Sequence, residues 1–588
     1  MNGVLRMLRN PLWLIVTIVL IWGISTFLVL PNLTLLGQVF SDGQGGVSLR
    51  AVERLLGSER AMRSLWNSLL LATILSATVN AVGIFLVLVT RLYAVRGARL
   101  LWLGYASTLV CGGIVLVFGY KQVYGPTGAV TRAVLGVFPD IDPNWFSGMF
   151  AVVLVMTFAS TGNHLLFLSA ALAKVDAQTL EAARMMGAGD LHILRRIILP
   201  QLKPMIFAIT ILTFLGGLGA LAAPQVLGGR DFQTITPMIL AFATTSTSRD
   251  LAATLAILLG IVTVVLLAAL NRLERGGVYL SVSKAPTPLT KQRIRNPFAN
   301  AIVHVLAYAL FVIYVLPPAL VVLYSFTDVQ AINAGVITPA SFTLDNYVAV
   351  FSTQKGLQPF LISVAYGLVA SVTVIVLMLF TARMVQRNRN VVTRALEYLL
   401  HIPWFLPSTL IALGLLVTFN VPQVPVLGTV LTGTFWILAI AYIIGKIPFT
   451  FRLLKAAFSG VPDHLEEAAS MLGASQLHTF RRVLLPLVAP TAAAITALNF
   501  TSLLDDYDSA IFLSHPLLQP LGVVIKNATS SETIGDSTAL IYVYTVLIMV
   551  ISTLVLWLVY GRAPRRRRAP ASAPAPIPAS VDNRKPAL

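Results

Sequence analysis

Three carboxylates lie within four consecutive residues near the end of the chain, at Asp505, Asp506 and Asp508, with Tyr507 among them. They form the densest acidic group in the sequence. Carboxylate oxygens suit hard cations, and acidic residues near the mouth of a pore attract cations and repel phosphate-like anions. Two plainer interpretations stay open: a solvated loop that caps a helix, or pairing with Lys526.

No other residues have a spacing typical of catalysis or of a resident metal. The seven histidines are scattered, without the spacing of a metal site, and the single cysteine, Cys111, excludes an intramolecular disulfide. The closest fragment to a phosphate-binding loop, Gly445-Lys446-Ile447, has no Ser or Thr at the next position and no upstream glycine at the right distance. We therefore expect no catalytic residue, no metal site and no cofactor in this chain.

A 20-residue pattern occurs twice, beginning at Glu181 and at Glu467, and 12 of its positions are identical at a constant offset of 286. Each copy has Glu-Ala-Ala, a glycine after three intervening residues, two adjacent arginines and a terminal Leu-Pro. The residues that define the copies are Glu181, Ala182, Ala183 and Gly187 in the first, and Glu467, Ala468, Ala469 and Gly473 in the second. Such a long duplication indicates two related halves that carry the same device.

Each copy predicts a short helix, a turn and a second helix. Asp176 is a plausible cap for the first helix and Pro462 a first-turn residue of its counterpart, while the glycines suit a left-handed helix end. The second helices are expected to begin near Asp190 and Ser475. Each should bury one apolar face and end at a proline; the predicted residues are Leu191, Leu194, Ile197, Ile198 and Pro200, and Leu477, Phe480, Val483, Leu484 and Pro486.

The elements that hold these loops are long apolar segments. Hydrophobic residues make up 57% of the 588 residues and charged residues 11%, against about 25% charged residues in soluble proteins. Because a helix needs roughly 20 residues to cross a bilayer, we predict an all-α, polytopic membrane protein with about 12 transmembrane helices. The expected spans are 11–31, 66–90, 100–119, 148–171, 204–222, 251–271, 301–326, 359–382, 397–419, 433–454, 490–504 and 538–560.

The spans divide into two parallel six-helix repeats. The predicted domains are 1–271, with the patterned loop 172–203, and 301–560, with the loop 459–489; they are joined by a polar linker, 272–300. Residues 561–588 are expected to be a disordered, basic tail. Of the 42 Lys and Arg residues, 32 fall on one side of this topology, which places both termini and both patterned loops in the cytoplasm. The net charge of +19 therefore indicates membrane orientation rather than nucleic-acid binding.

The duplicated pattern resembles the EAA motif of permease subunits of ATP-binding-cassette importers that use a substrate-binding protein. Both copies match at every defining position, with Val483 for Ile as the one variation. The resemblance covers essentially the whole chain, and two halves in one chain are similar to the fused permeases of the ferric-iron type. These group with thiamine, aminophosphonate and polyamine permeases.

The resemblance implies a type I importer fold, a bacterial inner-membrane location and a translocation pathway provided entirely by this chain. It also implies that Glu181, Ala182, Ala183 and Gly187, with Glu467, Ala468, Ala469 and Gly473, couple the chain to two cytoplasmic ATPase subunits. Those partners would bind ATP and magnesium, and an extracytoplasmic binding protein would deliver substrate. The expected lipid contact is that of any spanning protein.

Substrate and mechanism remain open between several alternatives. The carboxylates at Asp505, Asp506 and Asp508, with Tyr507, are the candidate substrate-pathway residues and favour ferric iron or a polyamine over aminophosphonate or sugar phosphate. Thiamine is a further alternative within the same permease class. A secondary transporter with an internal repeat is the alternative class; it predicts inverted repeats and buried midplane charges, whereas these repeats are parallel. A membrane enzyme would need a catalytic arrangement, and the sequence has none.

Overall fold

The computed structural model describes residues 11–40, 46, 48–229, 231–245, 248–274, 289–334, 337–388, 390–462, 464–529 and 536–560. The predicted tail 561–588 and residues 275–288 of the predicted linker lie outside these described residues. Within them the secondary structure is helical apart from isolated β-bridges. Ten helices are long and apolar enough to cross a membrane, and two bent helix pairs raise the number to twelve if each pair is one span. The predicted all-α, twelve-span architecture is confirmed.

The first half contains six spans in sequence order. Its helices are α2 (Pro11–Ile24), η1 (Ser25–Val29), α3 (Leu30–Phe40), α4 (Arg50–Leu56), α5 (Glu59–Val87), η2 (Leu88–Leu92), α6 (Ala98–Tyr105), α7 (Ser107–Val110), α8 (Gly113–Tyr124), α9 (Ala129–Val137), α10 (Gly148–Ser160), η3 (His164–Leu168), α11 (Ser169–Leu172), α12 (Ala177–Met185), α13 (Asp190–Ile193), η4 (Leu194–Ile198), α14 (Leu199–Leu218), α15 (Ala222–Leu227), α16 (Ile235–Ala243) and α17 (Arg249–Glu274).

The second half repeats this order. Its helices are α18 (Pro297–Ser325), α19 (Val329–Ala334), η6 (Pro339–Ser341), α20 (Asp345–Ser352), α21 (Gln354–Arg387), α22 (Val391–Phe405), α23 (Ser408–Thr418), η7 (Val424–Val426), α24 (Phe435–Ser459), α25 (His464–Met471), α26 (Gln476–Thr479), η8 (Phe480–Leu484), α27 (Leu485–Leu504), α28 (Ala510–Leu513), α29 (Leu521–Thr529) and α30 (Asp536–Tyr560).

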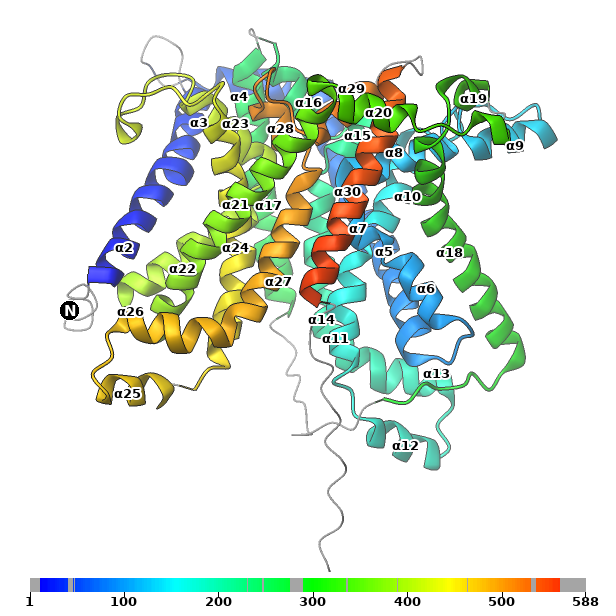
Figure 1. Cartoon of the computed structure of the whole chain (residues 1–588), viewed down its shortest axis with the longest axis horizontal. Coiled ribbons are helices and arrows are strands. Elements are labelled where there is room, and N and C mark those ends of the chain that lie inside the picture. Colours follow the sequence, from blue (N-terminus) through cyan, green and yellow to red (C-terminus); the bar gives the residue numbers. More distant parts are fainter. Residues whose placement is uncertain are drawn as a thin grey trace, which may run out of the picture.

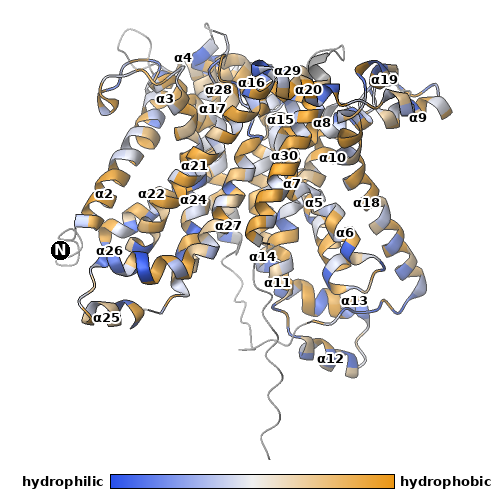
Figure 2. Cartoon of the chain, viewed as in Figure 1, coloured by the Kyte–Doolittle hydropathy of each residue, from blue (hydrophilic) through white to orange (hydrophobic). Residues whose placement is uncertain are grey.

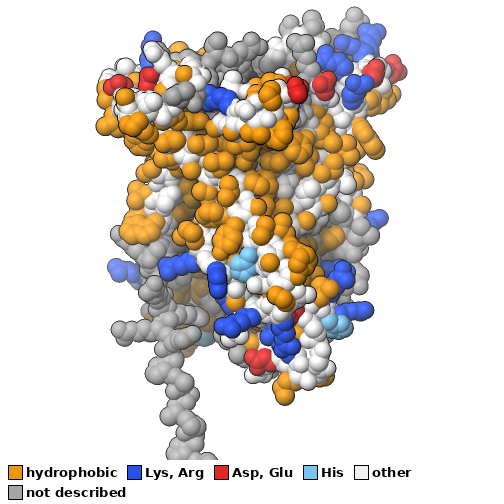
Figure 3. Space-filling view, turned by 90° about the vertical axis from the view of Figure 1, so that its right-hand side faces the viewer, with side chains coloured by type: hydrophobic (Ala, Val, Ile, Leu, Met, Phe, Trp, Pro, Cys, Tyr) orange, Lys and Arg blue, Asp and Glu red, His pale blue; other side chains and the backbone are white. Residues whose placement is uncertain are grey.

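The distribution of apolar side chains over the bundle indicates how it would lie in a membrane. Figure 2 shows hydrophobic residues along the long helices and hydrophilic residues gathered at the short helices α12, α13 and α26. In the space-filling view a broad hydrophobic band separates two charged ends (Figure 3). This distribution is the one expected of helices whose outer surfaces face lipid, because charged side chains are costly in the hydrocarbon region.

The third span is bent in both halves. The helical segments Ala98–Val110 and Gly113–Val137 meet at 117°, and Val391–Phe405 and Ser408–Thr418 meet at 102°. The first break has Gly112 and Gly113, the latter at φ +45°, and the second contains Pro407, directly before α23. Glycine tolerates the left-handed conformation and proline cannot continue a helix, so both breaks have a local cause.

The first span of each half packs against the other half. Phe27 of η1 lies 5.5 Å from Phe419, just after α23, between ring centroids, and Thr17 of α2 contacts the sulfur of Met384 in α21 at 3.5 Å. In the reciprocal contact Tyr105 of α6 donates a hydrogen bond of 2.7 Å to the carbonyl of Ala307 in α18. The two halves are therefore interlocked through their first spans.

The two predicted loop devices project from one end of the molecule. Figure 1 shows α12 and α25 at opposite corners of this end, below the bundle, with the start of α2 and the end of α30 on the same side. We call residues 177–198 the first bracket and residues 464–484 the second bracket, and the end that carries them the bracket side.

Candidate functional site

The first bracket is formed by the residues that the duplicated pattern singled out. Asp176 caps α12, its Oδ1 accepting a hydrogen bond of 3.3 Å from the amide of Gln178, as predicted. The chain turns at Gly187, whose φ is +85°. No atom lies within 4 Å of the position that a Cβ would take at Gly187. Backbone conformation alone, and not crowding, therefore requires glycine there.

The second bracket has the same turn and a different beginning. Gly473 has φ +77°, and Ser475 caps α26 by accepting a hydrogen bond of 3.3 Å from the amide of His478. The prediction that Pro462 is in the first turn is wrong, because α25 begins two residues later, at His464. In the first bracket the corresponding cap position belongs to Gly189, and Asp190 is the first helical residue rather than the cap.

Each bracket continues without interruption into the fifth span of its half. In each bracket the second helix, α13 or α26, is joined to the fifth span, α14 or α27, by a π-helical turn, η4 or η8. Pro200 and Pro486 were expected to close each unit, but each is the second residue of α14 or α27 and lies inside a continuous helical span, Asp190–Leu218 or Gln476–Leu504. The π turn also shifts the predicted apolar face, so Leu191 and Leu477 are exposed. Each bracket is therefore joined to a fifth span by continuous helix.

The Glu-Ala-Ala residues divide between the surface and the interior. Glu181 and Ala182 are exposed while Ala183 is buried; Glu467 and Ala468 are exposed while Ala469 is half-buried. The first two residues of each motif thus remain accessible to another protein. The third residue, an alanine, is on the inner side of the bracket, where its small side chain allows close packing.

Sequence reasoning missed the most exposed apolar residues of the brackets. Met185, Met186, Met471 and Leu472 are 90%, 82%, 88% and 88% exposed. They occupy equivalent positions at the ends of α12 and α25, immediately before the turning glycines. Exposed apolar residues gathered at a polar tip indicate a protein contact, and methionine adapts to an irregular partner surface. Their repetition in both copies was the available signal. We call these four residues the bracket tips.

A cavity of about 430 Å³ lies between the halves. Thr108, Leu109 and Gly112 line it from the bent third span of the first half, Thr213 from α14, and Thr501 and Asp505 from the second half. The fifth spans α14 and α27 thus connect the brackets to the walls of this cavity. Helices that move with the brackets would change its shape.

Asp505 is one of the residues that line this cavity. The residue is 6% exposed, and its Oδ2 has no hydrogen-bond partner. The oxygen lies close to the break in the other half's third span, 3.4 Å from where a Cβ would stand at Gly112. A buried carboxylate oxygen without a partner is costly unless a ligand or water completes it.

The other members of the acidic group have local roles. Asp506 accepts a hydrogen bond of 3.1 Å from the amide of Ser509, the residue just before α28. Tyr507 donates a hydrogen bond of 2.5 Å to Gln225 in α15. The solvated-loop interpretation is wrong for Asp505 and Tyr507, because both are buried. Of the predicted four residues, the structure brings Asp505 to the cavity and uses Asp506 and Tyr507 in the surrounding framework.

The electrostatics of this group are set by burial, just beyond the end of the span Gln476–Leu504. Burial, and next the charge of Asp506, raise the pKa of Asp505 to about 7. Burial, with Asp506 and Asp505, also raises the pKa of Asp508 to about 7. Lys446 of α24 is within electrostatic range of Asp505 and Asp506. Near neutral pH a cation that enters the cavity must compete with a proton.

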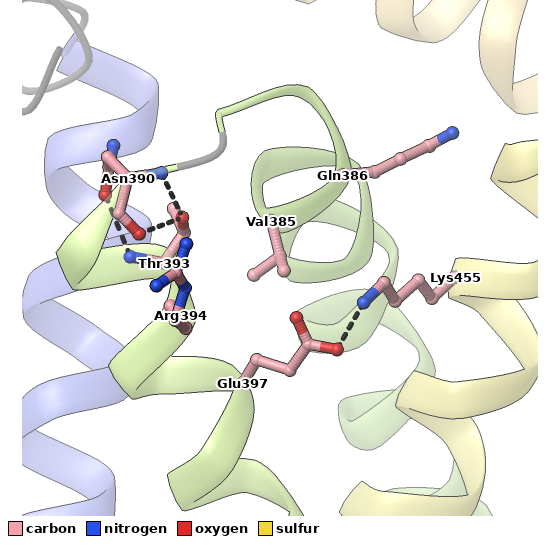
Figure 4. Close-up of a pocket in the computed structure, with 7 residues that line it drawn as sticks. All are labelled: Val385, Gln386, Asn390, Thr393, Arg394, Glu397 and Lys455. Atoms are coloured by element: carbon pink, nitrogen blue, oxygen red, sulfur yellow. Dashed lines mark hydrogen bonds and ion pairs between the residues drawn. The ribbon is translucent and has the colours of Figure 1, made fainter.

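A second cavity, of about 230 Å³, lies within the second half on the bracket side. Figure 4 shows Glu397 of α22 and Lys455 of α24 pointing toward one another across it, joined as an ion pair. Because its one carboxylate is already paired and its walls come from one half, this cavity is a poor candidate for a pathway through the molecule.

The described residues contain no group of three or more His, Cys, Asp or Glu side chains placed to hold a metal ion. The candidate site is therefore an open cavity between the two halves, lined by one unpartnered carboxylate. The fifth spans, which continue from the two brackets, contribute to its walls.

Comparison with known proteins agrees with this arrangement. A family model described as "Binding-protein-dependent transport system inner membrane component" matches residues 9–275 and 375–568. The chain belongs to this family. It is 38% identical over 540 residues to "Probable ABC transporter permease protein y4fN" of Sinorhizobium fredii, covering 92% of this chain and 94% of that protein. The chain is thus an ABC transporter permease of the membrane, as the EAA resemblance implied.

More distant relatives are named for particular substrates. The permease is 23% identical to the ferric transport system permease protein FbpB of Actinobacillus pleuropneumoniae over 536 residues, which cover 91% of this chain and 76% of that protein. It is 27% identical over 273 residues to PhnV of Salmonella paratyphi A, a protein named for 2-aminoethylphosphonate transport, covering 46% of this chain and 98% of that protein.

Proposed function

We propose that this permease imports a hard cation, with ferric iron as the first candidate, through the cavity between its halves. The observation that carries the proposal is that Asp505, a buried acid whose Oδ2 has no hydrogen-bond partner, is among the residues that line that cavity. An oxygen ligand in a buried site favours a hard cation. The similarity to FbpB supports iron within this class.

A single carboxylate suits the transient contact that transport needs. A site with three or more ligands would hold a ferric ion and slow its release, whereas one carboxylate next to hydroxyl groups lets it pass. Thr108, Thr213 and Thr501 supply such hydroxyl groups on the cavity wall. In this mechanism selectivity comes from the binding protein that delivers the ion, and the permease supplies a compatible path.

The brackets would dock on two copies of a cytoplasmic ATPase subunit. The bracket tips offer apolar side chains that fit a groove, and Glu181 and Glu467 offer exposed charge beside them. The partner subunits would bind ATP and magnesium and close on them. Because each bracket is continuous with α14 or α27, closure would move the cavity walls and alternate access between the two sides.

The orientation follows from charge and partner requirements. The bracket side would face the cytoplasm, with both termini, and the far side would receive an extracytoplasmic substrate-binding protein. The excess of Lys and Arg in segments on the bracket side supports this orientation in a bacterial inner membrane.

A 2-aminoethylphosphonate-like zwitterion is a second candidate, favoured by a specific pair of charges. Lys446 lies within electrostatic range of Asp505 and Asp506, so a zwitterion next to Asp505 would experience the field of a positive charge as well as of a negative one. The similarity to PhnV supports this alternative. Replacing Lys446 with Gln separates the candidates: zwitterion transport should fall, whereas removal of a positive charge should not reduce cation transport.

The experiment that tests the proposed function begins with the partners. Copurification of the binding protein, followed by analysis of its bound ligand, identifies the substrate class. Uptake of that ligand is then measured in proteoliposomes that contain the permease, the ATPase and the binding protein. A bound ferric ion, with uptake reduced by Asp505→Asn, supports the proposal, and a bound phosphonate or sugar phosphate overturns the choice of iron.

A further inference from the structure

A buried ion pair ties the second bracket to the neighbouring span. Glu466 precedes the motif residue Glu467 and is 6% exposed. Its Oε1 accepts from both Nε and Nη2 of Arg383 at 2.7 Å. Its Oε2 accepts from Nη1 of Arg387 at 2.5 Å. Both carboxylate oxygens are therefore held by guanidinium groups from the end of α21.

The arginine at the centre of this cluster is itself fully packed. Arg383 is 2% exposed, donates a further hydrogen bond of 2.9 Å to Oε1 of Gln386, and lies 5.9 Å from the ring centroid of Phe458. A buried charge of this kind needs its partners, because removing one partner leaves the other charged and unpaired. The geometry of the cluster is therefore closely defined.

The first half replaces this ion pair with apolar residues at the same positions. The spans Glu59–Leu92 and Gln354–Arg387 are both 34 residues long, so Arg383 and Arg387 correspond to Leu88 and Leu92. The residue equivalent to Glu466 at the offset of the duplicated pattern is Leu180. Leu88, Leu92 and Leu180 are buried in one apolar cluster. The same joint is thus apolar in one half and charged in the other.

The first bracket has a second attachment, to the described end of the linker. Gln292 accepts a hydrogen bond of 2.6 Å from Arg184 in α12, and its backbone pairs with Leu92 and Ala94. Asp190 accepts one of 3.3 Å from the amide of Arg295. The second bracket has Ser470 and Gln476 where the first has Arg184 and Asp190, so it lacks the side chains for this attachment.

We propose that Arg383, Arg387 and Glu466 form a charged anchor that positions the second bracket on α21, whereas apolar packing and the linker position the first. The anchor's role in coupling rests on the proposed docking of the brackets to an ATPase. Helix α21 also packs along α27, where the ring of Phe500 lies against Gly367. The anchor therefore connects the second bracket to the cavity wall by a route separate from η8.

Spin labels test the position of each bracket without the ATPase. Cys111, the sole cysteine, is buried and is replaced by Ala. One label is attached through Met471→Cys in the second bracket, and the matched label through Met185→Cys in the first. Glu466→Leu should increase the mobility of the Met471 label several-fold and leave the Met185 label unchanged. Equal mobility at Met471 before and after the substitution would overturn the anchor.

A transplant of the first half's chemistry separates positioning from folding. The triple variant Arg383→Leu, Arg387→Leu and Glu466→Leu removes all three charges and reproduces the apolar joint. It should restore the immobile Met471 label and at least half of the ATP hydrolysis stimulated by the binding protein, which Glu466→Leu should reduce about tenfold. If Glu466→Leu fails to insert, Glu466→Gln replaces it, since it keeps the shape and weakens the charge pairing. A mobile label in the triple variant would still support the anchor, because it would show that this joint needs its charges.

Cross-linking identifies which proposal has failed. In the parent protein the Met471→Cys position should cross-link to the ATPase subunit. Absence of that cross-link contradicts the docking of the second bracket. The mobility of the spin label, measured without the ATPase, tests the anchor independently of docking.

Discussion

The carboxylate of Asp505 lies against Gly112, so that the end of the fifth span of one half meets the break in the third span of the other. A Cβ at Gly112 or Gly113 would stand 3.4 Å from Oδ2 of Asp505. The bend of 117° thus leaves room for an acidic side chain to enter the cavity. This contact joins the halves at the point where a solute would pass between them.

Cation uptake should depend on pH because of this carboxylate. Its pKa is raised to about 7 by burial and by Asp506, so the charged form is lost as the pH falls through 7. Initial rates of uptake should therefore fall by roughly tenfold between pH 8 and pH 6. The variant Asp505→Asn, which cannot titrate, should show a flat profile over this range; a wild-type slope in this variant would assign the titration to another group.

The turning glycines should be needed for coupling but not for insertion. Gly187 and Gly473 have positive φ, which costs other residues roughly 1–2 kcal/mol, more for a β-branched side chain. Gly187→Val with Gly473→Val should give normal membrane levels, weak association with the ATPase and little uptake. Gly189 has φ −72° and open space for a Cβ, so Gly189→Ala is the matched control. Full uptake in the double variant would contradict the coupling role of the brackets.

The bracket tips should contribute to ATPase affinity without contributing to stability. Replacing Met185, Met186, Met471 and Leu472 with Gln removes apolar contacts from side chains that are already exposed. Each side chain buried in a partner contributes on the order of 1 kcal/mol or more, so affinity should fall at least a hundredfold. Thermal unfolding should not change. Leu427→Gln, at an exposed position outside the brackets, should leave the affinity for the ATPase unaltered.

Two adjacent glycines of α14 should respond differently to the same substitution. A Cβ at Gly217 would lie 2.8 Å from the Cα of Ala72 in α5, whereas Gly216 has open space and lines the cavity. Gly217→Leu should therefore lower the folded yield by separating two packed helices. Gly216→Leu should fold normally and reduce uptake by filling the cavity. Equal folded yields would show that close packing at Gly217 is not required.

The sequence predicted the secondary-structure elements better than the tertiary contacts between them. Apolar segments and the duplicated pattern identified the spans and brackets, since length and periodicity depend on nearby residues. The position of Asp505 depends on a bend at Gly112, nearly 400 residues away in the chain, so no local pattern indicates it. The anchor at Glu466 was missed for the same reason: its partners belong to another span.

Some local details were also beyond sequence reasoning. The 3.6-residue periodicity of an α-helix placed Leu191 on the buried face. The π turn at η4 shifts the helical register, and the periodicity gives no sign of such a turn. The bracket tips were missed because Met185 and Met471 resemble core residues until their exposure is known.

The central claim is that a cation contacts Asp505 on its way through the cavity. Its most direct test is the initial rate of ferric iron uptake into proteoliposomes by the wild type and by Asp505→Asn at two salt concentrations. The variant keeps the size of the side chain and removes its charge, so uptake should fall roughly tenfold, the loss of one charge-assisted contact, with the larger loss at low ionic strength. Docking of the ATPase should be unchanged. Equal initial rates at low salt would contradict the claim.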